Sequence, residues 1–253
     1  LYTAYTGMKN EQRRLDVLSN NLANADTTGY KKEGVTSRAF HELYSVKIND
    51  ASEPNITRPI GKMSLGVRIG ESYRDWSEGS IKNTGNTYDL ALTGKGFFTI
   101  SSTDKSGKEH IRYTRDGEFI RTSDGYLTTK DGDYVLDNEG NKLQIPEAKS
   151  IAFSGDGRIE CDGVVSGQIG ITDFADYNYL EQYGENAYET VDGAEKIPCT
   201  TTVEQGLLET SNVNVVQEMV TMITVERAYQ TGQKVISSVD SMLDKAVNQV
   251  GRV

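Results

Sequence analysis

The residues of this chain that could do chemistry are few, and their spacing fits no common reaction. Gly94-Lys95-Gly96 lacks the third glycine of a phosphate-binding turn and precedes a predicted strand, so it does not indicate a nucleotide site. Ser154 lies in the turn sequence Ser-Gly-Asp-Gly rather than in the strained turn that presents a nucleophilic serine. We therefore predict no catalytic residue, no cofactor and no small-molecule substrate.

Metal-ligating side chains are equally sparse. The two histidines, His41 and His110, are too far apart in sequence to suggest a ligand pair or a catalytic triad. Four oxygen-bearing side chains lie close together, at Asp131, Asp133, Asp137 and Asn138. They do not follow the calcium-loop pattern of alternate acids followed by glycine, so we assign them to hairpin turns, with a weak Ca²⁺ site as the alternative. We predict no metal site and no enzyme.

The C-terminal end predicts one long amphipathic helix. Residues 214–250 contain no proline and one glycine, and their apolar residues alternate at spacings of four and three. The seam predicted from this spacing consists of Val215, Met219, Met222, Tyr229, Ile236, Leu243, Val247 and Val250. Glu226, Gln233 and Asp240 occupy the other seam positions. Such a helix is about 55 Å long. Its narrow seam favours contact with another helix over the alternative, which is packing on the surface of its own domain.

The first residues predict a second helix, from about Thr3 to Asn24, with the same spacing. Its seam consists of Leu1, Tyr5, Met8, Leu15 and Leu22. The helix is expected to end before Asp26-Thr27-Thr28-Gly29, where glycine can take a positive φ. Asn214 is expected to cap the start of the C-terminal helix. We predict that the two terminal helices pair as a coiled coil.

The middle of the chain predicts antiparallel β-structure. Short runs of β-branched and aromatic residues recur from Leu90 to Thr172, separated by Asp-Gly pairs that favour two-residue hairpin turns. We assign residues 71–211 to one β domain of sandwich or barrel type and residues 29–70 to an extended connector of little regular structure. With residues 1–28 and 212–253 forming a helical domain, the predicted fold class is α+β.

Charge is distributed unevenly over these segments. The whole chain has a net charge of −10. Residues 1–32 carry five Lys/Arg and three Asp/Glu, and residues 212–253 carry four of each, so residues 33–211 hold −12. Nearly neutral helices can pack in many copies without strong repulsion. The acidic balance does not suit nucleic acid or an anionic membrane as partner. No apolar run indicates a membrane span or a secretory signal.

At both ends and in the middle, the residues resemble the bacterial flagellar rod and hook axial proteins. The segments that carry the resemblance are Leu1–Ala4, Gly7-Met8, Leu15–Asn24, Thr27–Lys31, Gly85-Asn86, Asp89–Leu92, Gly94–Phe98, Tyr113–Gly117, Leu208–Asn214, Glu218–Val220 and Glu226–Gln230. They follow the order of the family over nearly the whole chain.

The resemblance implies a structural subunit that polymerises helically through its terminal helices and forms part of the shaft between motor and hook. A hook subunit carries a further outer domain, so the single middle domain favours a rod protein. The segments Leu65–Arg68, Gly79-Ser80 and Thr84–Asn86 look most like the distal rod protein, with a proximal rod protein as the alternative. A different class also fits the layout, namely a β-rich envelope binding module that oligomerises through terminal helices.

The resemblance also implies partners and a location. The partners would be further copies of this chain, other rod proteins, the hook protein and the rings that surround a rod. The location would be the flagellar basal body, reached through the flagellar type III export system without a cleaved signal peptide. Within such an assembly, we expect Asn20 and Asn21 to form hydrogen bonds with neighbouring subunits.

Overall fold

The chain divides into two compact units. The computed structural model describes residues 1–47, 58–104, 107–199 and 201–250. Unit 1 consists of Leu1–Ala23, Glu33–Asp75 and Asn214–Val253, and unit 2 consists of Asn24–Lys32 and Trp76–Val213. The two ends of the chain therefore belong to one unit, and most of the middle belongs to the other.

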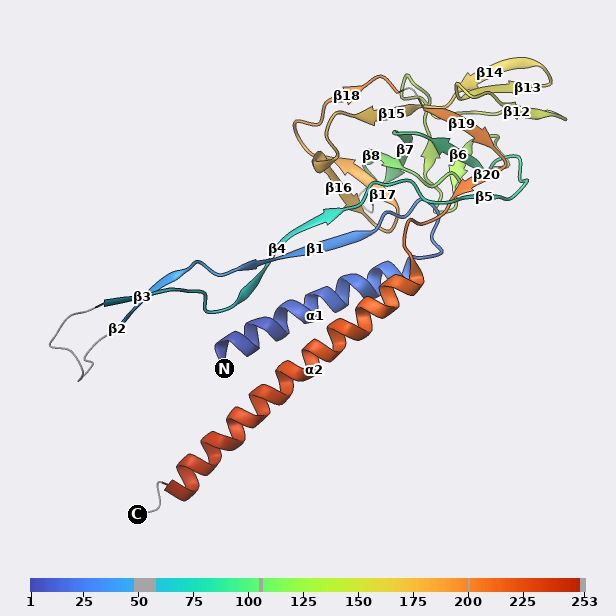
Figure 1. Cartoon of the computed structure of the whole chain (residues 1–253). Coiled ribbons are helices and arrows are strands. Elements are labelled where there is room, and N and C mark those ends of the chain that lie inside the picture. The colour runs from blue at the N-terminus through green and yellow to red at the C-terminus, as the bar shows by residue number, and fades with distance from the viewer. Residues whose placement is uncertain (48–57, 105–106, 200, 251–253) are drawn as a thin grey trace. The chain divides into compact units, whose positions relative to one another are not determined.

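Two helices dominate unit 1. Helix α1 (Tyr2–Ala23) and helix α2 (Val215–Lys245) lie side by side and run antiparallel (Figure 1). Helix α2 continues in a π-helical turn, Ala246–Val250. Asn214 caps α2 as predicted, because its side chain accepts a hydrogen bond from the backbone N of Gln217 at 3.1 Å. The helix pair is confirmed, whereas coiled-coil geometry stays a prediction. Within the described residues, no helix has the length and hydropathy needed to cross a membrane.

A two-stranded ribbon completes unit 1. Strand β1 (Glu33–Ala39) pairs antiparallel with β4 (Val67–Arg74), and β2 (Leu43–Lys47) pairs with β3 (Arg58–Met63). This differs from the connector of little regular structure that we predicted for residues 29–70. Strand β1 has one large apolar residue, Val35, and so lacks the apolar alternation from which strands are predicted. In β4 the apolar residues Val67, Ile69 and Tyr73 do alternate, but Glu71 interrupts them. Residues 48–57 of the predicted connector lie outside the described residues.

Unit 2 consists mainly of short strands and one 3-10 turn, η1 (Tyr177–Tyr179). The strands are β5 (Ile81–Asn83), β6 (Leu90–Thr93), β7 (Phe97–Thr103), β8 (Glu109–Thr114), β9 (Phe119–Arg121), β10 (Leu127–Thr129), β11 (Tyr134–Val135), β12 (Ile151–Phe153), β13 (Arg158–Cys161), β14 (Val164–Gln168), β15 (Ile171–Phe174), β16 (Leu180–Tyr183), β17 (Ala187–Thr190), β18 (Lys196–Ile197), β19 (Thr202–Gln205) and β20 (Leu207–Glu209).

The pairing of these strands is antiparallel throughout the described residues, as predicted. The largest sheet has the order β16-β17-β8-β7-β11-β10-β9, and β15 pairs with both β7 and β18. Strands β12, β13 and β14 form a separate sheet, β19 pairs with β6, and β20 pairs with β5. The described pairings do not return on themselves, so they form no closed barrel. The sandwich arrangement stays a prediction.

Unit 2 has two apolar clusters. The larger one is built from strand residues such as Leu90, Phe98 and Leu127, each fully buried. The smaller one is aromatic and surrounds Trp76, whose ring centroid lies 5.6 Å from that of Phe97 and 5.0 Å from that of Tyr188. Trp76 is the only tryptophan in the chain, so its fluorescence reports on the folding of unit 2.

Candidate assembly surfaces

One face of α2 packs towards α1. This face shares some residues with the predicted seam, and its other residues come from positions outside the seam. Met222, Tyr229 and Ile236 of that seam are half-buried. The other positions of α2 that are buried or half-buried are Glu218, Thr221, Val225, Gly232 and Val239. The polar residues that interrupted the predicted seam are exposed, namely Glu226, Gln233 and Asp240. The packed face therefore uses neighbouring positions and excludes the three polar residues of the predicted seam, although Glu218 is buried in it.

Gly232 allows α1 to approach α2 closely. A Cβ atom at this position would lie 2.7 Å from Cγ of Met8 and 3.8 Å from the backbone oxygen of Ala4. Glycine costs a helix interior about 1 kcal/mol relative to alanine. The close contact with α1 gives a packing reason for that cost.

Two groups of large apolar side chains on α2 remain exposed. The start stripe, Val216, Met219, Val220 and Ile223, has the spacing of one helix face and exposed fractions of 73, 47, 60 and 51%. The end stripe, Met242, Leu243 and Val247, has exposed fractions of 59, 54 and 71%. Soluble monomers rarely expose contiguous apolar patches, and such patches commonly mark interaction sites.

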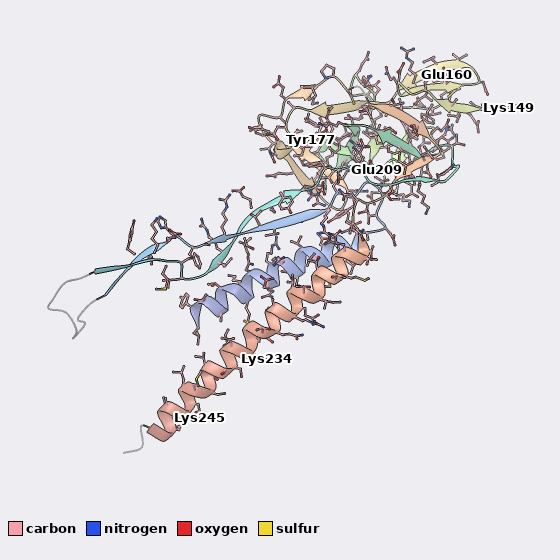
Figure 2. The ribbon with its side chains drawn as sticks, viewed as in Figure 1. Lys149, Glu160, Tyr177, Glu209, Lys234 and Lys245 are labelled. Atoms are coloured by element: carbon pink, nitrogen blue, oxygen red, sulfur yellow. The ribbon has the colours of Figure 1, made fainter. Side chains whose placement is uncertain are left out.

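The end stripe is exposed because α2 extends beyond the start of α1. Helix α2 has 31 residues and α1 has 22, and in Figure 1 the end of α2 continues past the start of α1. Lys234 and Lys245 lie along the second half of α2 (Figure 2). Leu243 follows Ile236 by two helical turns, so it continues the face that packs on α1 but has no part of α1 opposite it.

The remaining predicted seam residues divide in the same way. Met8, Leu15 and Leu22 of α1 are half-buried, whereas Leu1 and Tyr5 are 63 and 52% exposed. On α2, Val215 is 36% exposed beside the start stripe. The side chain of Val250 lies outside the described residues. An inter-subunit role for the seam stays a prediction.

Asn21 is fully buried at the end of α1 and holds the start of β1. Its amide nitrogen donates to the backbone oxygen of Glu33 at 2.8 Å, and its amide oxygen accepts from the backbone N of Glu33 at 3.0 Å. We had expected these groups to bond a neighbouring subunit. They bond within the chain because the segment between α1 and β1, residues 24–32, brings the backbone of Glu33 back to the end of α1. For Asn20, which is exposed, the inter-subunit role stays a prediction.

Replacing Asn21 by alanine is expected to lower the free energy of unfolding by about 2 kcal/mol, because both backbone groups of Glu33 lose their partner. The matched change at a nearby exposed residue of α1, Ser19→Ala, is expected to alter it by less than about 0.5 kcal/mol. Urea unfolding followed by circular dichroism measures both. Equal losses for the two variants would contradict the assigned role of Asn21.

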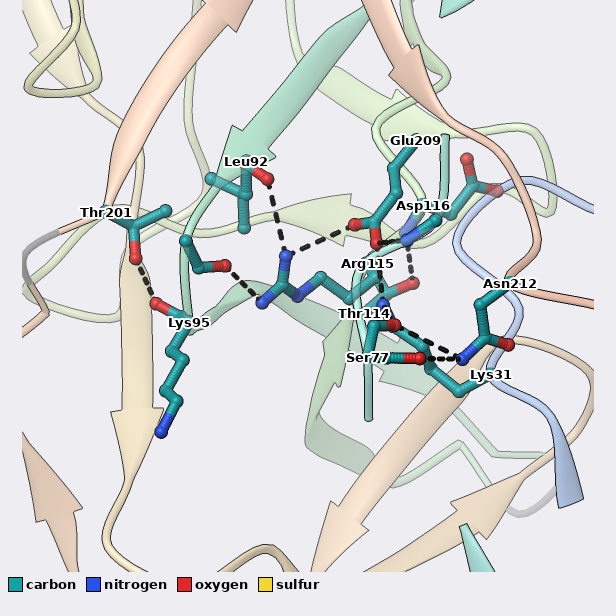
Figure 3. Close-up of polar contacts among 12 residues, drawn as sticks. Lys31, Ser77, Leu92, Lys95, Thr114, Arg115, Asp116, Thr201, Glu209 and Asn212 are labelled. Carbon is teal, nitrogen blue, oxygen red and sulfur yellow. Dashed lines mark hydrogen bonds and ion pairs between the residues drawn. The ribbon is translucent and has the colours of Figure 1, made fainter. Parts of the chain in front are cut away.

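Unit 2 contains a buried group of three charged side chains, which we call the ion triad: Lys31, Arg115 and Glu209 (Figure 3). The Nζ of Lys31 donates to Oε1 of Glu209 at 2.6 Å, and a terminal nitrogen of Arg115 donates to Oε2 at 3.2 Å. All three side chains are at most 4% exposed. Burial lowers the pKa of the Lys31 ammonium, and Glu209 opposes this by favouring the charged form.

The side chains considered for chemistry serve local structure. Asp137 accepts hydrogen bonds from the backbone N of Glu139 and of Asn141, each at 2.8 Å, as a hairpin turn requires. His110 lies 3.4 Å from a carboxylate oxygen of Glu189. Among the described residues, no three His, Cys, Asp or Glu side chains gather as a metal site.

Three family models match this chain in sequence order. "Flagella basal body rod protein" matches residues 1–31, "Flagellar hook protein FlgE/F/G D1 domain" matches residues 91–161, and "Flagellar basal body rod FlgEFG protein C-terminal" matches residues 204–250. Together they include both helices and the first part of the β domain.

Curated relatives match over the full length. The flagellar basal-body rod protein FlgG of Bacillus subtilis (strain 168) is 34% identical, with 98% of this chain and 97% of the relative covered. The chain belongs to the flagellar basal-body rod proteins. The rod protein FlgF of Caulobacter vibrioides is 32% identical, with coverage of 100 and 98%. The hook-basal body complex protein FlhO of Bacillus subtilis is 30% identical, with coverage of 100 and 98%.

This rod protein is a structural subunit, and its ion triad joins the three segments that the family models match. Lys31 ends the first segment, Arg115 lies in the second, and Glu209 lies in the third. Sequence analysis did not single out these three residues. One feature of the sequence could have indicated them. All three lie in segments that resemble the family, and in those segments they are charged residues among apolar and turn-forming residues.

Proposed function

We propose that this rod protein polymerises helically through α1 and α2 and forms part of the shaft between motor and hook. The observation that carries the proposal is the pair of exposed apolar stripes on α2. Burying one Leu, Ile, Val or Met side chain contributes about 1.5–3 kcal/mol, so the two stripes together can drive association. Their occupant in the proposal is the helical part of neighbouring copies.

The division of charge between the units supports this arrangement. Unit 1 carries 13 Lys/Arg and 12 Asp/Glu, whereas unit 2 carries 14 Lys/Arg and 25 Asp/Glu. Copies can therefore approach through unit 1 without strong repulsion, while close packing of unit 2 from many copies is opposed by its charge. The helices are thus the favoured place for contact between subunits.

Within the rod, we place this chain in the distal part. The support is the similarity to the relative named FlgG from Bacillus subtilis and to FlgG of Buchnera aphidicola subsp. Acyrthosiphon pisum, each 34% identical. The proximal position remains the second candidate because FlgF of Caulobacter vibrioides is covered almost completely at 32% identity. In either position the other rod proteins and the hook protein are proposed partners, and export through the flagellar type III system is the proposed route.

Deleting the gene is expected to leave basal bodies with incomplete rods and no hooks, because later subunits have no surface to build on. Electron microscopy of isolated basal bodies measures this, and the wild-type gene supplied on a plasmid is the control. Basal bodies with complete hooks in the deletion strain would contradict a rod role. Gold labelling of an epitope-tagged copy separates the two positions, since a distal subunit lies next to the hook.

A further inference from the structure

The ion triad of unit 2 holds two cations and one anion in direct contact. The charge of Glu78 also raises the pKa of Lys31, but its contribution is smaller than that of Glu209. Besides their contacts with Glu209, Lys31 donates to the backbone oxygen of Ser77 at 2.8 Å and Arg115 donates to that of Gly94 at 2.6 Å. The Nε of Arg115 is buried without a hydrogen-bond partner. Among the described residues, Glu209 is therefore the one carboxylate that contacts both cations directly.

Backbone groups from two other segments also form hydrogen bonds with Glu209. The backbone N of Gly79 donates to Oε1 of Glu209 at 2.9 Å, and the backbone N of Gly29 donates to the backbone oxygen of Glu209 at 2.9 Å. Three residues later, Asn212 accepts from the backbone N of Lys32 at 2.7 Å. The segment that ends the β domain thus completes contacts with the segment that follows α1 and with the segment before β5.

Without Glu209, closure of unit 2 would bury Lys31 and Arg115 near each other with no carboxylate of the described residues in direct contact with both, and Glu78 would act on Lys31 alone. Removing one partner from a buried ionic group leaves an uncompensated charge and is strongly destabilising, whereas replacing the whole group with apolar side chains is often neutral. The two cations also lie far from Glu209 in sequence, by 178 residues for Lys31 and 94 residues for Arg115.

We propose that the ion triad is a closure device that makes the folding of unit 2 conditional on the arrival of residues 207–212. A chain that emerges N-terminus first presents both cations long before their counterion. Unit 2 then stays open until little more than α2 remains to follow. This inference concerns the folding order of the chain and holds wherever the subunit sits in the rod.

The test is the refolding rate of the full-length chain after dilution from urea, followed by Trp76 fluorescence. If Glu209 must join before unit 2 can close, Glu209→Gln is expected to slow refolding at least about tenfold, because the barrier then includes burial of two uncompensated cations. The triple variant K31M/R115M/E209M removes the charges together and is expected to refold within about threefold of the wild-type rate.

The matched control is Glu109→Gln, which removes the carboxylate of the exposed pair with Lys142 (2.8 Å) and is expected to leave the rate unchanged. If Glu209→Gln refolds at the wild-type rate and only unfolds faster, unit 2 closes before the triad forms and the proposal is overturned. If Glu209→Gln does not refold at all, the triple variant decides: recovery supports the device, and failure to refold overturns it.

Discussion

Replacing Leu243 by aspartate is expected to abolish rod assembly and motility without changing the melting temperature of the monomer. Leu243 is 54% exposed in the end stripe of α2, so the isolated chain can solvate the new charge. In the proposed polymer the same position is buried against a neighbouring copy. An unpaired buried charge there costs several kcal/mol in every subunit. Swimming in soft agar, electron microscopy of basal bodies and thermal unfolding of the purified variant measure these effects.

The matched control introduces the same charge on the opposite side of α2. Ser241 is exposed and lies next to Asp240, where an acidic residue is already accommodated, so Ser241→Asp is expected to leave cells motile. Val225→Asp should behave differently from both, because Val225 is 2% exposed and its loss destabilises the monomer itself. Motile cells with normal basal bodies carrying Leu243→Asp would show that the end stripe is not an interface.

The sequence predicted the helices well because their signals are local. A cap such as Asn214 acts on the backbone beside it, and a spacing of four and three residues needs no knowledge of the partner. The same spacing left the exact face undecided. Met222, Tyr229 and Ile236 belong both to the predicted seam and to the face that packs on α1, so only the partner decides which neighbours join them.

The features that were not predicted from the sequence depend mostly on contacts between residues far apart in the chain. The ion triad joins residues up to 178 positions apart, and no periodicity connects a lysine after one helix with a glutamate before another. The Asn21 contact was misjudged for a related reason. Its partner is the backbone of Glu33, and a backbone group leaves no trace in the residue types. The β1–β4 ribbon was missed because β1 has only one large apolar residue, Val35, and the alternation in β4 is interrupted by Glu71.

Gly29→Ala is expected to lower the free energy of unfolding of unit 2 by about 3 kcal/mol, a large part of the stability of a typical domain. Gly29 has a φ of 67°, which costs a residue with a Cβ about 1–2 kcal/mol. A Cβ there would also lie 2.5 Å from the backbone C of Arg115 and from the backbone N of Asp116. Backbone atoms cannot rotate away, so the segment after α1 must move. Urea unfolding followed by Trp76 fluorescence measures the loss.

The control for this prediction is Gly132→Ala. At Gly132 an added Cβ causes backbone strain but meets no neighbouring atom, so this variant measures the cost of the strain alone. Its φ is 91°, and a Cβ there would meet nothing within 4 Å. Alanine at this position is expected to lower the free energy of unfolding by about 1 kcal/mol, because only the left-handed backbone conformation is strained. The difference between the two variants therefore isolates the close approach of Gly29 to Arg115, which holds the segment carrying Lys31 against the β domain. Equal losses for Gly29→Ala and Gly132→Ala would mean that this approach relaxes freely and that the segment is not held there.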